Sequence, residues 1–434
     1  MTPLRRPAFF TLFGCLTCLL AFSQPGHGGD ADWPQWRGPA RDGHAAPQEL
    51  LQSWPEGGPA LVWSAKDLGT GYSAVTEFEG RLYTMGSVED QAYVICLSAE
   101  DGSKLWQTPV GPAGKKGDYN TGWGAGQRGT PTIDGDQVFV ITDLGVAAAV
   151  DRVSGDLQWS VDMVAQYGGK VPVWGYSESP LVDGQRVIVT PGNENFLIGL
   201  DRTSGQKVWA SQGVNAPAQY VSVMKGMLGG REYYVTASKP GVYLFDVESG
   251  QGTLADEATG NKVAVIPTPI IEDDLLYHTS AYGAGNTLLK LEGTPANPMV
   301  DPLYTLNTKT MENHHGGVVL VEGVIYGFTK QSGGAWMAQD FKTGETLWQE
   351  RVRPNRSGSI CYADGLLYCY NDKEGTVLLV QPSRDGFQKL GELTLPAQTD
   401  IPRGSGAIWA HPVVSNGRLL IRDQDLLYAF DIAR

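Results

Sequence analysis

The sequence predicts an all-β fold: an eight-bladed β-propeller of four-stranded antiparallel blades, with the last blade closed by an N-terminal strand. Three observations carry this prediction. A motif of Asp, Ser or Thr, Gly and Trp recurs along the chain, eight two-residue turns precede alternating apolar segments, and the 434 residues include 56 glycines and 26 prolines. That glycine and proline content favours many short strands joined by turns over long helices.

The recurring motif reads Asp, two variable residues, Ser or Thr, Gly, three residues and Trp. Clear copies run Asp151–Trp159, Asp201–Trp209 and Asp340–Trp348, and weaker copies run Ser98–Trp106 and Asp246–Leu254. The Asp carboxylate is expected to accept hydrogen bonds from backbone N–H groups just downstream and so to start a turn. The Gly can take a positive φ without steric cost, and the Trp can fill the gap between two packed sheets. An internal repeat of this kind decides the architecture.

The eight predicted hairpins supply the strands of each repeat. Their turns are Glu79-Gly80, Asp134-Gly135, Asp183-Gly184, Gly229-Gly230, Asp273-Asp274, Glu322-Gly323, Asp364-Gly365 and Asn416-Gly417. Asp-Gly and Asn-Gly between apolar runs are strong hairpin signals. Each unit then reads as strand, turn, strand, loop, strand, Asp turn and Trp-bearing strand, which is a four-stranded propeller blade.

The two ends of the chain complete the ring. The eighth unit stops at Arg434, where a Trp-bearing strand should follow, and the strand Ala60–Trp63 precedes the first complete hairpin. We therefore expect the N-terminal strand to complete the last blade, with Trp63 beside Tyr428. Such closure removes the exposed sheet edges of an open array.

The first 58 residues precede the propeller, which is predicted over residues 59–434. Residues 1–23 have the pattern of a secretory signal peptide, with Arg5 and Arg6 before the apolar run Ala8–Phe22. That run is too short to span a membrane comfortably, and no later segment qualifies. A lipoprotein anchor at Cys15 is the less favoured alternative. Residues 24–58 are predicted to form an irregular arm packed on the propeller by its Trp side chains, and the protein is expected to be exported, either periplasmic or secreted.

Charge and cysteine content limit the partners and the chemistry. A formal net charge of −14 without a basic cluster argues against nucleic acid or anionic lipid as a partner. We expect a monomer whose partner is a protein or a cell-envelope ligand. Cys361 and Cys369 flank the turn at Asp364-Gly365, so a cross-strand disulfide is conceivable, although buried free thiols are the favoured interpretation.

At these motifs the chain resembles the PQQ-like β-propeller repeat family, whose tryptophan docking motif the Asp-to-Trp copies match. That superfamily contains quinoprotein alcohol dehydrogenases and the outer-membrane assembly protein BamB. Trp33–Pro39, taken with His411–Val414, also resembles a subgroup of exported bacterial propellers. The resemblance implies the fold but leaves the function open between enzyme and scaffold.

The first strand of each propeller blade lines the central channel, so the residues that enter those strands are predicted to ring one mouth. The candidate binding residues in this ring are Arg128, Glu178, His315, Arg356, Trp409 and His411. Residues that converge on a pre-formed cavity are the default binding-site hypothesis. The alternative is that they hydrogen-bond one another and plug the channel. Because His314 and His315 are adjacent, they are expected to point to opposite faces of a strand, with at most one in the channel.

Two functions follow from this ring. The favoured one is a binding or scaffold protein of the cell envelope, similar to BamB, with no catalytic residue and no certain cofactor.

The alternative is a PQQ- and calcium-dependent quinoprotein dehydrogenase that oxidises an alcohol or a sugar. In such enzymes a Glu, an Asn and a catalytic Asp gather at the metal; Glu178 could match the Glu, but no Asp base can be assigned and no two Cys are adjacent. Arg128 or Arg356 could hold the anionic quinone, and a transition-metal site of His278, His315 and His411 is a further hypothesis.

Overall fold

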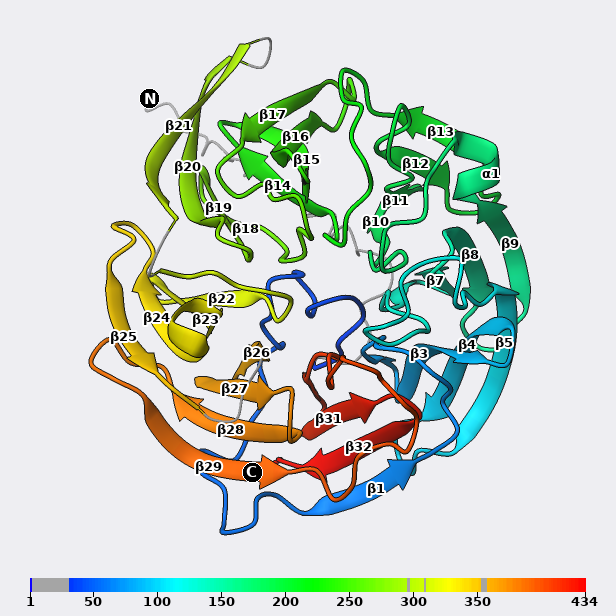
Figure 1. Cartoon of the computed structure of the whole chain (residues 1–434), viewed down its shortest axis with the longest axis vertical. Helices are drawn as coiled ribbons and strands as arrows, with labels where there is room; N and C mark the ends of the chain where they lie inside the picture. The colour runs from blue at the N-terminus through cyan, green and yellow to red at the C-terminus, as the bar shows by residue number, and fades with distance from the viewer. Residues whose placement is uncertain (2–30, 295–296, 308–309, 353–356) are drawn as a thin grey trace.

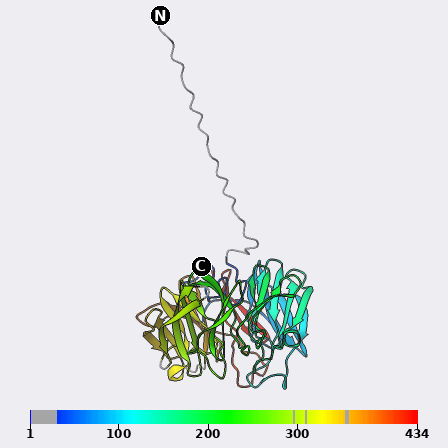
Figure 2. The ribbon, with the colours of Figure 1, turned by 90° about the horizontal axis from the view of Figure 1, so that it is seen from above.

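The computed structural model describes Met1 and residues 31–294, 297–307, 310–352 and 357–434. Over these residues, eight four-stranded antiparallel sheets surround a central axis, as the sequence predicts (Figure 1). Figure 2 shows the same ring of sheets from its side. The predicted signal peptide and Cys15 lie outside the described residues. Within the described part of the chain, no helix has the length and apolar character needed to cross a membrane.

Blades 1 to 4 occupy the first half of the ring. Blade 1 contains β2 (Thr76–Phe78), β3 (Arg81–Val88), β4 (Gln91–Ser98) and β5 (Lys104–Pro112). Blade 2 contains β6 (Thr132–Asp134), β7 (Gln137–Ile141), β8 (Val146–Asp151) and β9 (Leu157–Asp162), which is followed by the short helix α1 (Met163–Tyr167). Blade 3 contains β10 (Leu181–Asp183), β11 (Arg186–Val189), β12 (Ile198–Asp201) and β13 (Lys207–Ala210), and blade 4 contains β14 (Met224–Leu228), β15 (Arg231–Ser238), β16 (Gly241–Asp246) and β17 (Gly252–Asp256).

Blades 5 to 8 complete the ring. Blade 5 contains β18 (Ile270–Glu272), β19 (Leu275–Ser280), β20 (Gly285–Thr294) and β21 (Asn297–Leu306). Blade 6 contains β22 (Val318–Val321), β23 (Val324–Thr329), β24 (Ala335–Asp340) and β25 (Thr346–Glu350), with a 3-10 turn at Gln331–Gly333. Blade 7 contains β26 (Gly358–Ala363), β27 (Leu366–Asn371), β28 (Thr376–Gln381) and β29 (Gln388–Thr394), and blade 8 contains β30 (Val413–Ser415), β31 (Arg418–Asp423), β32 (Leu426–Asp431) and β1 (Leu61–Ala65).

The recurring motif ties blade 2 to blade 3. In blade 3 the Oδ1 of Asp201 accepts hydrogen bonds from the backbone N–H groups of Thr203 and Ser204, which forms the predicted turn. Trp159 of blade 2 packs on Gly205 of that turn and donates a 2.7 Å hydrogen bond from Nε1 to the carbonyl of Arg202. The Trp side chains therefore join neighbouring blades through the Asp turns.

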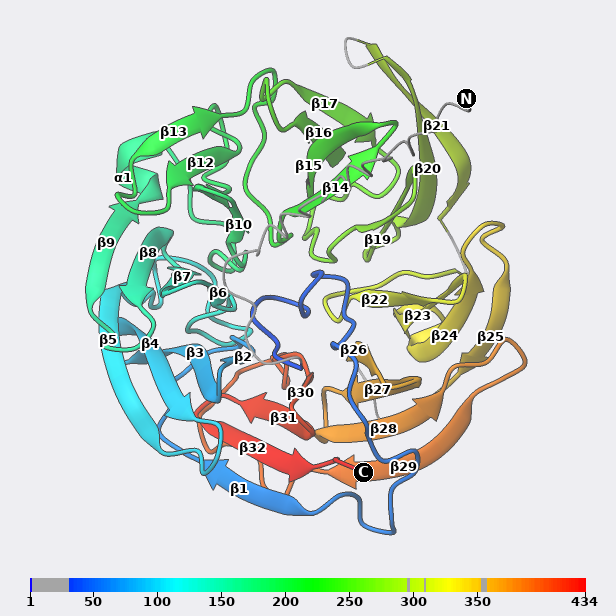
Figure 3. The same cartoon turned by 180° about the vertical axis from the view of Figure 1, so that it is seen from behind.

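The N-terminal strand closes blade 8 as predicted. Strand β1 pairs antiparallel with β32, with Trp63 opposite Ala429 and Ser64 opposite Tyr428, and both strands lie at the rim of the ring (Figure 3). Trp63 then donates from Nε1 to the carbonyl of Ala99 in blade 1. The first and last blades are thus joined by the same contact that joins the others.

Arg422 on β31 is a second link between blades 8 and 1. Its fully buried guanidinium donates to the carbonyls of Leu68, Gly69, Ser73, Met85 and Gln424 and to Oγ1 of Thr84. Burial lowers the pKa of Arg422 to about 9. Buried charges are tolerated when they are hydrogen-bonded in this way. Arg422 therefore stabilises the seam, which is the interface between blades 8 and 1.

Strand direction divides the ring into two faces. The inner strand of each blade begins at the entry face, where the connections between the second and third strands also lie. The eight two-residue turns lie at the opposite hairpin face. In one of these turns Asp364 and Gly365 have φ values of 45° and 82°, and two successive positive φ values are typical of a type I′ hairpin.

The described part of the arm is irregular and crosses the centre of the ring from the hairpin face (Figure 3). Trp33 and Trp54 are buried against the blades. Arg41 donates to the carbonyls of Ser179 and Pro180 in blade 3, and Arg37 donates to the carbonyl of Val318 in blade 6. Burial lowers the pKa of each arginine to about 10. Residues 33–43 therefore cross the channel, whereas Trp54 reaches the outer strand β29 of blade 7, where its backbone N–H donates to the carbonyl of Leu390.

The two cysteines of blade 7 are buried free thiols, as favoured from the sequence. Cys361 pairs with Tyr368, so Cys369 is one residue out of register. Cys361 packs in the cluster shared with blade 8, whereas Cys369 packs in the cluster shared with blade 6. The two thiols therefore lie on opposite faces of the sheet.

Candidate functional site

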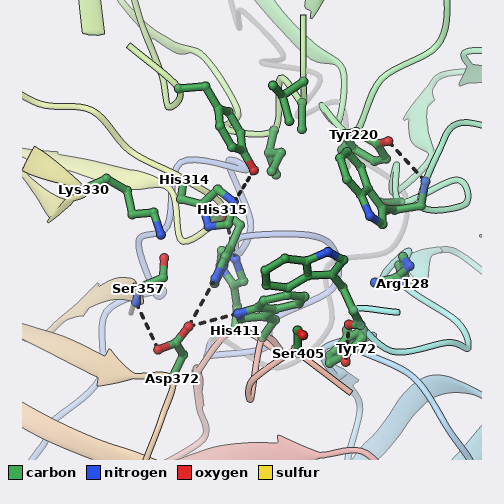
Figure 4. A pocket seen from close by; sticks show the side chains of 18 of the residues that line it. Tyr72, Arg128, Tyr220, His314, His315, Lys330, Ser357, Asp372, Ser405 and His411 are labelled. Carbon is green, nitrogen blue, oxygen red and sulfur yellow. Dashed lines mark hydrogen bonds and ion pairs between the residues drawn. The ribbon is translucent and has the colours of Figure 1, made fainter. Parts of the chain in front are cut away.

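A pocket of about 640 Å³ opens at the entry face above the arm (Figure 4). It is lined from all eight blades and their connections, and from the arm. The lining side chains used below are Trp36, Tyr72, Trp123, Arg128, Trp174, Ser177, Tyr220, Ile266, Tyr282, His314, His315, Lys330, Ser357, Asp372, Trp409 and His411. Its volume is in the range of about 300–1,000 Å³ that is usual for small-ligand sites.

The structure brings together four of the six predicted site residues: Arg128, His315, Trp409 and His411. Arg356 lies outside the described residues. Glu178 does not line the pocket; it is 1% exposed in the interior. Both residues lie in the irregular segment before β10, where the Glu178 side chain is buried in the interior and Ser177 lines the pocket.

Glu178 is held by hydrogen bonds inside the protein. Its Oε2 accepts from the backbone N–H of Thr190 at 2.9 Å, and its Oε1 accepts from the Thr190 hydroxyl at 2.8 Å. Burial raises the pKa of Glu178 to about 8, against the lowering effects of these bonds and of nearby Arg41. This carboxyl group therefore serves the contact between blade 3 and the arm and offers no oxygen to the pocket.

An aromatic wall forms one side of the pocket. The rings of Trp123 and Trp409 stack at an interplanar angle of 23° with centroids 6.3 Å apart, and Tyr72 lies 5.3 Å from Trp409. The guanidinium of Arg128 sits over the Tyr72 ring at 5.0 Å and donates to the carbonyl of Gly124. At the floor, Trp36 of the arm contacts the His411 ring and donates to Oγ1 of Thr268.

Asp372 is the polar centre of the opposite wall. Its Oδ2 accepts a 2.9 Å hydrogen bond from Nε1 of Trp409, and its Oδ1 accepts from the backbone N–H of Ser357 at 3.1 Å. Nε2 of His315 lies 3.7 Å from Oδ2. The Asp372 side chain is only 1% exposed, so its carboxylate positions the Trp409 ring rather than facing solvent.

Both adjacent histidines reach the pocket, so the expectation that at most one would do so is wrong. They precede β22 in an irregular segment, where the strict alternation of a strand does not apply. Nε2 of His314 forms a 2.8 Å hydrogen bond with the Tyr282 hydroxyl. Nε2 of His411 lies 3.1 Å from the carbonyl oxygen of His315. Burial lowers the pKa of His314 and of His411 well below the usual range, so both rings are neutral at pH 7.

Several buried polar atoms of the lining residues have no hydrogen-bond partner within the described residues. They are Nε1 of Trp174, Nδ1 of His314, both ring nitrogens of His315 and Oγ of Ser357. Buried polar groups in native proteins are almost always paired with protein, water or ligand. These atoms therefore mark positions where a bound molecule would find donors and acceptors.

The pocket does not fit a calcium site. Calcium takes about six to eight oxygen ligands, whereas Asp372 is the one carboxylate among the described lining residues and both of its oxygens are engaged. Over the described chain, no group of three or more His, Cys, Asp or Glu is placed to hold a metal ion. His278 lies away from the pocket, hydrogen-bonded to Thr259 and Pro267, so His278, His315 and His411 do not converge.

Sequence reasoning missed part of the site. Tyr282, Lys330 and Asp372 follow the second strands of blades 5, 6 and 7, whereas only the residues entering the first strands were considered. The signal was available, because both kinds of connection lie at the same end of an antiparallel blade. Trp36 could not be placed in this way, because it comes from the irregular arm.

These features define a closed eight-bladed propeller with a pocket at one mouth. A family model described as "Outer membrane protein assembly factor BamB" matches residues 56–174 and 90–350, which together cover more than half of the chain. The chain belongs to this family of PQQ-like repeat propellers. The comparison with curated protein sequences found no significant match.

Three solved structures illustrate the fold. The chain is similar to BamB from Moraxella catarrhalis, with a TM-score of 0.57 and 17% identity over 86% of this chain and 97% of that chain. It is also similar to the quinohemoprotein alcohol dehydrogenase from Comamonas testosteroni, with a TM-score of 0.62 and 12% identity over 92% and 80% of the two chains. The computationally designed Ika8 protein gives a TM-score of 0.56 at 10% identity over 86% and 99%. Identities this low establish the fold and leave the function undecided.

Proposed function

We propose that the protein is an exported binding protein of the cell envelope that holds a ligand in the mouth pocket. The observation that carries this proposal is the convergence of loops from all eight blades on one pocket of about 640 Å³. The aromatic wall and the unpaired polar atoms are properties of a binding surface. Export rests on the signal-like residues 1–23 and on the family to which the chain belongs.

The description of the family as an outer membrane protein assembly factor supports a related form of this proposal, in which a monomer binds a protein partner. The net charge of −14 weighs against nucleic acid in either form. A partner protein would reach the pocket with a side chain or a loop.

The quinoprotein dehydrogenase remains the second candidate, because one structural neighbour is a quinohemoprotein alcohol dehydrogenase. Arg128 and the stacked indoles of Trp123 and Trp409 would suit a flat anionic quinone. The lack of a fitting calcium site in the described lining makes this the weaker candidate, and we assign no catalytic step to it.

One pair of measurements separates the two candidates. The mature chain, residues 24–434, is mixed with PQQ and calcium, and dye reduction is followed with a panel of alcohols and sugars. The binding proposal predicts no turnover above the protein-free blank. Turnover that depends on calcium and quinone would overturn it.

A further inference from the structure

The aromatic wall presents flat apolar surface to solvent. Trp123 is 42% exposed although its ring stacks on Trp409, and Tyr282, whose ring contacts that of His314, is 46% exposed. Exposed aromatic rings gathered at a concave site mark a place where another molecule packs. The first requirement on the ligand is therefore a flat apolar face.

The remaining walls set a second requirement. The unpaired indole N–H of Trp174 is a donor, the Ser357 hydroxyl can donate or accept, and the ring nitrogens of His314 and His315 take either role according to tautomer. In Figure 4, His314, His315 and Ser357 lie on the same side of the pocket as Asp372. The ligand must offer several small donors and acceptors around its edge.

A pyranose ring meets both requirements. Its C–H faces pack on indole and phenol rings, and its hydroxyl groups project from the edge, where each can donate and accept. A flat polycyclic anion meets the first requirement but needs several cations, and the described lining supplies Arg128 and Lys330 together with the carboxylate of Asp372. A lipid chain would offer these polar atoms no hydrogen-bond partner.

Resting on the binding function proposed above, we infer that the pocket binds the end of a carbohydrate chain, with one sugar ring on the faces of Trp123 and Trp409. The arm is the reason that we place the end of the carbohydrate chain, and not its middle, in the pocket. Trp36 forms part of the floor, and Arg37 and Arg41 of the arm are bonded to blades 6 and 3 across the channel below. A chain that enters from the entry face meets this floor and does not pass through the ring.

The test uses the mature chain, residues 24–434. A broad glycan array selects candidates, and isothermal titration is then run with cellohexaose, xylohexaose, chitohexaose and galacturonate hexamers, and with PQQ in a separate arm. We expect saturable binding of at least one hexasaccharide at micromolar to millimolar concentration. Trp123→Ala should weaken that binding by at least about tenfold, equivalent to 1.4 kcal/mol. Leu105→Ala, which removes a comparably exposed apolar side chain from the outer strand of blade 1, should leave it unchanged.

Ser357→Ala is a second variant that removes only a buried hydroxyl and should weaken binding about threefold or more without loss of folding. Absence of hexasaccharide binding at millimolar concentration, or sugar binding that neither Trp123→Ala nor Ser357→Ala weakens, overturns the inference. If PQQ binds without turnover and no sugar binds, the sugar inference fails while the binding function stands. If PQQ supports calcium-dependent oxidation, the binding function itself fails.

Discussion

The indole Nε1 of Trp409 donates a 2.9 Å hydrogen bond to Oδ2 of Asp372, and this bond joins blade 8 to blade 7 at the wall of the pocket. The same carboxylate also accepts from the backbone of Ser357, and it is almost fully buried. A buried acceptor with two fixed donors holds a ring more firmly than packing alone. The aromatic wall is therefore anchored by Asp372, a residue that itself has little contact with solvent.

Asp372→Asn should loosen this wall. An amide has one oxygen for two donors, so its NH₂ group must face either the Trp409 N–H or the Ser357 N–H. We expect ligand affinity to fall about tenfold through the misplaced indole, as for the loss of one charge-assisted hydrogen bond, measured by titration of tryptophan fluorescence. Asp90→Asn is the matched control, because Asp90 ends the second strand of blade 1 at the same topological position but is 80% exposed beside Lys115. Equal effects of the two variants would contradict the anchoring role.

Arg422→Met should destabilise the closure of the ring. Its removal leaves buried carbonyls of the seam without their donor, and the free energy of unfolding should fall by about 3 kcal/mol or more. Urea unfolding followed by circular dichroism measures this change. Arg418→Met on the same strand breaks a half-exposed pair with Asp431 and should cost less than about 1 kcal/mol. A loss below 1 kcal/mol in both variants would show that the seam does not depend on Arg422.

Gly205→Ala tests the docking of Trp159 between blades 2 and 3. A Cβ at Gly205 would lie 2.8 Å from Cε3 of Trp159, whereas a Cβ at Gly184 of the same blade meets open space. Both glycines have positive φ, 71° and 59°, so both variants carry the backbone cost. The difference between them isolates the clash, and Gly205→Ala should lose about 1–3 kcal/mol more in urea unfolding. Equal losses would mean that the Trp159 ring moves aside freely.

Gly317→Ala should undock the arm. A Cβ there would lie 1.9 Å from Nη1 of Arg37, whose side chain is buried and bonded to the carbonyl of Val318. Trypsin should then cleave after Arg37 and Arg41 about tenfold faster, because cleavage follows the population of the undocked arm. Gly323→Ala in the same blade also has positive φ but open space around its Cβ, and its cleavage rate should match the wild type. Unchanged cleavage in Gly317→Ala would contradict the tight fit of Arg37 in the channel.

Glu178 should make the protein less stable as pH rises. Its pKa is raised to about 8 in the folded state by burial, so the folded protein holds a proton that the unfolded chain releases near pH 4.5. The contribution of this bound proton to the free energy of unfolding is complete below pH 4.5, and it is lost as pH rises through about 8. Between pH 5 and 9, the wild-type Tm should therefore fall by several degrees relative to that of Glu178→Gln, which cannot titrate. A constant Tm difference between the two proteins over this range would show that Glu178 is ionised in the folded state.

The fold was predictable because local signals repeat. Each Asp turn, such as that at Asp201, forms from its own neighbours, and each two-residue turn sets its own hairpin. Eight similar units leave few architectures, and the missing strand at the C-terminal end identified the partner of β1. The course of the arm was harder to foresee, because Arg37 and Arg41 are held by backbone carbonyls of blades 6 and 3 that no local pattern specifies.

The site was predictable only in part, for physical reasons. The strand-entry rule located Arg128, His315, Trp409 and His411. It misplaced Glu178 because this residue lies in an irregular segment, where its side chain is held by Thr190, a contact that no local pattern specifies. It omitted Asp372, whose role depends on the donors that blades 7 and 8 bring together in three dimensions.

The most direct test of the account is hydrogen–deuterium exchange of the mature protein with and without the tightest-binding hexasaccharide of the panel. We predict slower exchange in the segments around Trp123, Trp174, His314 and Trp409, which the pocket brings together from four separate loops. Protection confined to the hairpin face or to the outer strands, with no change in these four loops, would contradict the claim that the mouth pocket is the binding site.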